Sequence, residues 1–87
     1  LLGKLGQYPL ALDYFQRAID YSRESSNDEP SLMAMYHLEI GRIYYSQTNH
    51  SHAREHFQHA LEYQQKSSTY DRRRLEEIRH YLSRVCA

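Results

Sequence analysis

Four histidines lie close together in the second half of the chain, and their spacing could support metal chemistry. They are His50, His52, His56 and His59. His52 and His56 are four residues apart, so on a helix they would share one face and could share a metal ion. No second pair of ligands accompanies them, so we predict a solvated outer helix surface and no metal site. A pH-sensitive patch remains the alternative.

The reactive side chains do not form a catalytic set. The single cysteine, Cys86, falls on the expected packing face of the last helix, where we interpret it as a small buried hydrophobic residue. No combination of nucleophile, base and orienting group can be assembled from the sequence, and it has no glycine-rich phosphate loop. We therefore predict that the chain is not an enzyme and binds no cofactor.

The charge balance makes nucleic acid an unfavourable partner. The 87 residues include 11 basic and 11 acidic side chains, which gives a formal net charge of zero. We interpret the basic run Arg72–Arg74 as an exposed helix start. No apolar run approaches the ~20 residues of a membrane span. A single cysteine fits a reducing compartment, so we expect a cytoplasmic, intracellular protein without membrane contact.

Four helical stretches would position these residues, and they cover about 9–25, 30–47, 51–66 and 70–86. Glycine and proline are scarce, at three and two residues. Helical spacing places Ala53, Phe57 and Ala60 on one face of the third stretch, and Met33, His37, Ile40, Gly41 and Tyr44 on one face of the second. Pro9 suits the first turn of the first helix. Ser68 and Asp71 resemble a capping box before the last helix.

An internal repeat connects these helices. A shift of 42 residues aligns two sets of apolar positions. It places Ala11, Phe15 and Ala18 on Ala53, Phe57 and Ala60, and it also places Tyr21 on Tyr63 and Arg42 on Arg84. One offset that aligns two successive helices is hard to reconcile with chance, so we predict a helical-repeat protein.

The repeated unit resembles the tetratricopeptide repeat, in its long variety of 42 residues where 34 is usual. Ile40-Gly41 and Tyr44 match the first-helix positions of that family, and Ala53, Phe57 and Ala60 match the second-helix positions. The stretch 5–8 reads like the turn between the two helices of an earlier copy, with Leu1–Leu5 as the tail of a truncated helix. The resemblance implies an all-α fold of antiparallel helix pairs stacked as a right-handed superhelix. It divides the single-domain fragment into a truncated repeat (1–26), a complete repeat (30–66) and the first helix of a further or capping repeat (70–87).

In this family the first helices line a concave groove that holds a peptide or helix of a partner. The resemblance places two sets of residues in that groove, and Lys4 would be a remnant of a third. The expected partner-binding residues are Met35, Leu38, Arg42, Tyr45 and Ser46 on the second stretch and Glu77, His80 and Arg84 on the last. Arginine binds carboxylates through a planar fork, so Arg42 and Arg84 could bind an acidic peptide. Alternatively they are solvated, or they pair with acids such as Glu39.

The function implied by the resemblance is a protein–protein interaction scaffold. The expected partner is a protein or peptide, and an acidic one would suit the two arginines. Structural self-association within a larger repeat protein is one alternative. Nucleic-acid binding by an α-solenoid is another, and the zero net charge argues against it.

Overall fold

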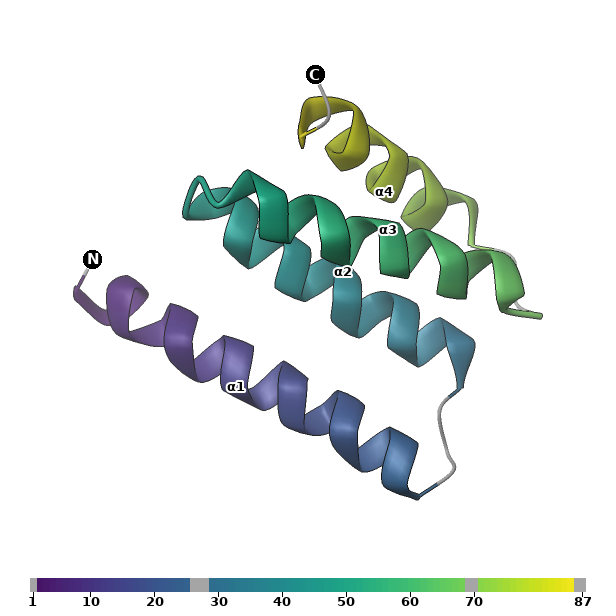
Figure 1. The fold of residues 1–87 in the computed structure, drawn as a ribbon, viewed down its shortest axis with the longest axis horizontal. Helices are drawn as coiled ribbons and strands as arrows, with labels where there is room; N and C mark the ends of the chain where they lie inside the picture. The colour runs from purple at the N-terminus through teal and green to yellow at the C-terminus, as the bar shows by residue number, and fades with distance from the viewer. Residues whose placement is uncertain (1, 26–28, 69–70, 86–87) are drawn as a thin grey trace.

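A computed structural model gives the backbone of residues 2–25, 29–68 and 71–85, with side chains described from residue 9 onward. The described residues form four α-helices and contain no strand: α1 (Leu2–Glu24), α2 (Pro30–Ser46), α3 (His50–Lys66) and α4 (Arg72–Val85). Figure 1 shows α2 and α3 side by side, with α1 on one side of this pair and α4 on the other. The all-α class and the stacked helices predicted from the sequence are therefore confirmed.

The first helix differs from the sequence prediction. We expected a turn at residues 5–8 and a helix start at Pro9, but α1 is one uninterrupted helix with Pro9 inside it. Glycine ends helices by taking a left-handed conformation, and none of the described glycines has a positive φ. Gly6 is therefore helical and does not form the predicted turn.

The pair α2 and α3 forms the centre of the fold. The two helices are joined by a short turn, in which Thr48 has a φ of 60°. A core cluster holds them together and reaches α4; its buried members are Leu38, Ala53, Phe57, Ala60 and Ile78. Because Ala53 and Ala60 are small, they let the backbones approach closely, and Phe57 fills the space between them.

Gly41 shows how closely α2 and α3 approach. A Cβ atom placed on Gly41 would lie 2.6 Å from Cε1 and 2.8 Å from Cδ1 of Phe57. Phe57 is fully buried, and its ring stacks on Tyr81 of α4 at a centroid distance of 4.9 Å. The glycine is therefore required for space, because its φ is negative and gives no reason for a glycine.

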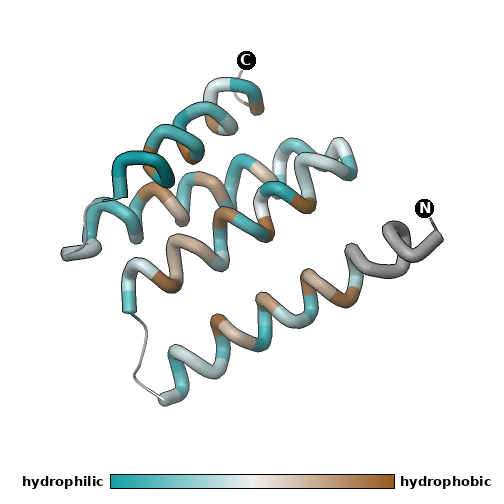
Figure 2. The backbone as a smooth tube through the Cα atoms, turned by 180° about the vertical axis from the view of Figure 1, so that it is seen from behind, coloured by the Kyte–Doolittle hydropathy of each residue, from teal (hydrophilic) through white to brown (hydrophobic). Residues whose placement is uncertain are grey.

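The outer helices attach to this pair in different ways. α1 packs on α2 through a second cluster, whose buried members are Ile19, Met33 and Ile40. α4 is preceded by Asp71, whose Oδ1 accepts a hydrogen bond from the Arg74 backbone N–H at 3.0 Å. Asp71 itself is therefore the N-cap, and the predicted capping box between Ser68 and Asp71 is wrong. Figure 2 shows the hydrophobic positions of α4 on the side toward α3, where Ile78 is fully buried.

Candidate functional site

The predicted groove residues lie on α2 and α4, and most of them are accessible. Arg42, Ser46, His80 and Arg84 are exposed, whereas Met35, Tyr45 and Glu77 are half-buried. Leu38 is the exception, because it is only 4% exposed and belongs to the core cluster with Phe57 and Ile78. Its side chain is therefore not available to a partner, and the candidate surface consists of the other seven residues.

Arg42 connects the two helices of this surface. Its Nη1 lies 2.9 Å from Glu39 Oε1 on α2 and 3.9 Å from Glu77 Oε2 on α4. Burial alone would lower the pKa of Arg42, but Glu39, Tyr81 and Glu77 raise it above its ordinary value. The contact with Glu39 is the alternative that the sequence left open. Glu39 and Glu77 both contact the same nitrogen of Arg42. Because a guanidinium carries five N–H donors in all, Arg42 has further donors on its other nitrogens.

A shallow depression beside Arg42 has a volume of about 190 Å³ and is lined by Glu39, Arg42, Ile43 and Ser46. The Ser46 hydroxyl donates to the Arg42 backbone carbonyl at 3.0 Å, which keeps the serine side chain close to its own helix. Ile43 supplies an apolar wall between charged neighbours. The depression therefore combines both signs of charge with one hydrophobic contact, an arrangement suited to a peptide side chain.

Arg84 has a different environment from Arg42. Its Nε donates to Nε2 of His80, one turn earlier on α4, at 3.2 Å. His80 can accept this bond only as a neutral imidazole with its hydrogen on Nδ1. No carboxylate contacts Arg84 among the ion pairs that the structure describes. The two repeat-related arginines thus present unequal charge environments to a partner.

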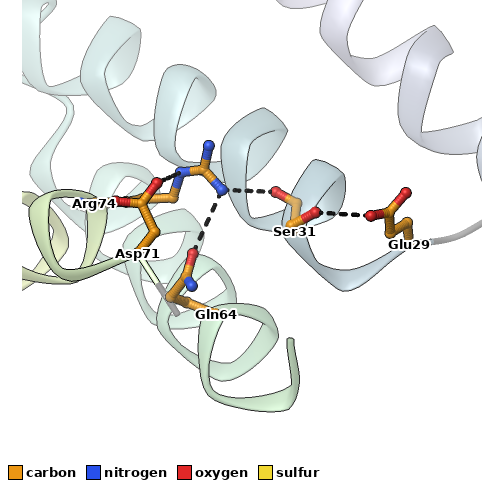
Figure 3. Close-up of polar contacts among 5 residues, drawn as sticks. All are labelled: Glu29, Ser31, Gln64, Asp71 and Arg74. Atoms are coloured by element: carbon orange, nitrogen blue, oxygen red, sulfur yellow. Dashed lines mark hydrogen bonds and ion pairs between the residues drawn. The ribbon is translucent and has the colours of Figure 1, made fainter. Parts of the chain in front are cut away.

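The run Arg72–Arg74 is only partly the exposed helix start that we predicted. Arg72 and Arg73 are exposed, but the Arg74 side chain is only 23% exposed. Figure 3 shows Arg74 of α4 reaching toward α2 and α3. Its Nη1 donates to the Ser31 carbonyl at 3.0 Å and to Gln64 Oε1 at 3.4 Å, and its Nε lies 3.8 Å from Asp71. Arg74 of α4 therefore connects α2 and α3 to α4, which gives this residue of the basic run a structural role.

Three of the four clustered histidines, His50, His52 and His59, are exposed as predicted, whereas His56 departs from the predicted outer surface. His56 of α3 is half-buried, and its ring stacks on His37 of α2 at 5.3 Å and on Tyr44 at 5.6 Å. His52 and His59 are exposed, yet their rings also lie 5.1 Å from Tyr44 and His37. Helical spacing had placed His37 on the packing face, and it is 6% exposed. Position 56 is three residues after Ala53, a spacing that could have placed His56 on the same face.

The described residues contain no group of three or more His, Cys, Asp or Glu side chains arranged to hold a metal ion. No helix in the described part of the chain is both long enough and apolar enough to cross a membrane. Cys86, Leu1 and Lys4 lie outside the described residues or side chains, so the predictions made for them are not tested here.

Comparison with known proteins identifies the family. A family model for the tetratricopeptide repeat matches residues 1–66, which is most of the chain. The chain therefore belongs to the tetratricopeptide repeat family, whose members are generally non-catalytic scaffolds for protein–protein interaction. Neither the curated proteins nor the solved structures contain a match. The repeat length of 42 residues stays a prediction.

Proposed function

We propose that the chain is a protein–protein interaction module that holds a partner peptide or helix on the face shared by α2 and α4. The observation that carries this proposal is Arg42, which joins Glu39 and Glu77 across the two helices beside an accessible depression. A side chain held by neighbours on two helices loses less conformational entropy when it binds a partner. Family membership gives the general role, and this arrangement supports the proposed position of the binding face.

The same contacts support a proposal for the chemistry of the partner. An isolated Arg42 would favour an acidic peptide, but Glu39 and Glu77 already supply two carboxylates. Arg84 donates a hydrogen bond to His80, and no ion pair among the described residues joins it to a carboxylate, so it is the freer cation of the two. We therefore propose a peptide with an acidic residue near Arg84 and a polar or mixed-charge segment near Arg42.

The division into repeats is part of this proposal. α2 and α3 would form the complete repeat (30–66), residues 1–26 would belong to the preceding repeat, and residues 70–87 would begin the next unit or cap the stack. The outer side of α4 favours a cap. Apart from His80 and Arg84 of the candidate binding surface, its exposed residues are Arg72, Arg73, Glu76, Arg79 and Ser83. Such a polar face suits water better than another packed helix.

The proposal can be tested with peptide display. Random 12-residue peptides would be selected on the intact chain, and selected peptides would be measured against the double variant Arg42→Glu and Arg84→Glu by calorimetry. We expect at least a tenfold loss of affinity with unchanged helicity by circular dichroism. The matched control is Arg17→Glu on α1, an exposed arginine paired with Asp13. Equal loss in the control, or no loss in the double variant, would contradict the proposed site.

Self-association is the second candidate function, and α1 favours it. Leu10, Tyr14 and Tyr21 are 71%, 66% and 71% exposed on this helix. A second copy could cover these side chains. Sedimentation over a hundredfold range of concentration separates the candidates, because only self-association gives a mass that rises with concentration.

A further inference from the structure

Two histidines meet inside the interface between α2 and α3. Nδ1 of His37 lies 3.1 Å from Nδ1 of His56, which is hydrogen-bonding distance. His37 is 6% exposed, and its other ring nitrogen, Nε2, is buried without a hydrogen-bond partner. A buried polar atom normally has a partner, so this pair is an exception that calls for an explanation.

Charged and titratable groups surround the pair from three helices. From α1, Arg23 acts electrostatically on His37. From α2, the Tyr44 ring stacks on His56. From α3, Tyr63 stacks on His37 at 5.5 Å and His59 lies 5.1 Å from it. His52 and Glu55, also on α3, act on His56. Glu55 is the one acidic group among these neighbours, so the surroundings offer little compensation for added positive charge.

The number of protons on the two imidazole rings decides whether the hydrogen bond between His37 and His56 can form. Only one hydrogen fits between two nitrogens 3.1 Å apart. In the neutral pair, His37 can donate from Nδ1 to His56, which leaves Nε2 of His37 without a hydrogen. Nε2 is then an unpaired acceptor and not an unpaired donor.

The first added proton changes this state whichever ring takes it. If His37 becomes an imidazolium, its Nε2 carries a hydrogen. If His56 does, it donates from Nδ1 to His37, and neutral His37 must then carry its hydrogen on Nε2. Both cases place an N–H donor at a buried position where the structure offers no acceptor. A second proton places two hydrogens between the Nδ1 atoms and breaks the bond.

We propose that His37 and His56 form a proton-sensitive joint that holds α2 against α3 when both imidazoles are neutral and loosens this pair of helices when the imidazoles take up protons. The joint would act whether or not the face of α2 and α4 binds a partner, so it goes beyond the proposed function. Mild acidity would therefore weaken the packing of α2 against α3.

The electrostatics of the folded chain agree with this geometry. Burial, His56, His59 and Arg23 lower the pKa of His37 from its ordinary 6.5 to about 4. Burial, together with His59 and His52, also lowers the pKa of His56, against the opposing effect of Glu55. The unfolded chain therefore binds more protons than the folded chain between about pH 6.5 and 4. Folding stability contributed by His37 is complete above this range and is lost as the pH falls through it.

The test is urea unfolding of the intact chain at constant ionic strength, followed by circular dichroism at pH 7 and pH 5. For the wild type we expect the unfolding equilibrium constant to rise on the order of tenfold between these values. His37→Phe keeps a flat ring against Tyr63 but cannot titrate, so its rise should be much smaller. The matched control, His50→Gln, replaces an exposed histidine at the start of α3 and should behave like the wild type.

An unchanged pH dependence in His37→Phe would overturn the proposal. If this variant does not fold at pH 7, His37→Gln, which also cannot titrate in this range, takes its place with the same expectation. The wild type supplies a measurement that needs no variant, namely NMR titration of its imidazole C–H signals. His37 should titrate at least one pH unit below the ordinary histidine pKa of 6.5, and titration of His37 at that ordinary value would also overturn the proposal.

Discussion

Replacement of Gly41 by alanine tests the close contact between α2 and α3. In a solvated helix the change would stabilise the protein by about 1 kcal/mol, because alanine is the better helix former. Here the new Cβ would lie 2.6 Å from the fully buried ring of Phe57. Overpacking of a core costs about 1–3 kcal/mol. The two effects oppose each other, and we expect a net destabilisation of up to about 2 kcal/mol.

Thermal unfolding by circular dichroism would measure this loss. For a domain of this size, about 1 kcal/mol corresponds to a Tm lower by about 4–8 °C. Phe57→Leu removes the ring atoms that Cβ would meet, so the double variant should lose about 1 kcal/mol less than the sum of the two single variants. Gln58→Ala, at an exposed position of α3, is the control and should stay within about 0.5 kcal/mol of the wild type.

Two outcomes would refute this reasoning. A Gly41→Ala protein that is more stable by about 1 kcal/mol would show helix propensity acting alone, without the close contact. Effects of Gly41→Ala and Phe57→Leu that add within about 0.5 kcal/mol would show that the two positions do not meet.

Two further predictions concern charged side chains. Arg74→Met removes the hydrogen bonds from the guanidinium to the Ser31 carbonyl and to α3, and should cost about 1–3 kcal/mol in urea unfolding. Arg73→Met, at an exposed neighbour, is its control, and equal losses would contradict the structural role of Arg74. Asp13→Asn breaks the ion pair with Arg17, and the Asp13 and Arg17 side chains are 58% and 80% exposed. Because solvent screens such a pair, the change should cost at most about 0.5 kcal/mol of folding stability. A loss above about 1 kcal/mol would show that the pair is not screened by solvent.

The sequence determined the helices and the residues that form their buried faces. Helical spacing selected Ala53, Phe57 and Ala60, and all three are fully buried. It also placed His37 and Ile40 on a packing face, where they are 6% and 2% exposed. These predictions succeed because helical periodicity is local, so that a spacing of three or four residues alone decides which side chains share a face.

The tertiary structure decided which neighbour each face meets. Leu38 was assigned to the groove from its phase on the helix, but α3 and α4 close over it. His56 was assigned to the outer surface, but α2 brings the ring of His37 against it. The edge of a buried face cannot be located from one helix, because its position depends on how closely and at what angle the neighbouring helices pack.

Long side chains and helix ends also separate what the sequence determined from what only the tertiary structure decided. The sequence identified the basic run 72–74, but only the positions of α2 and α3 give Arg74 its acceptors on Ser31 and Gln64. The glycine and proline near the start predicted a turn, yet α1 continues through them. The sequence alone thus determined an all-α repeat protein with the correct packing faces. The structure decided which side chains are free for a partner and which are held inside, because contacts between residues distant in the chain exist only after the helices have packed.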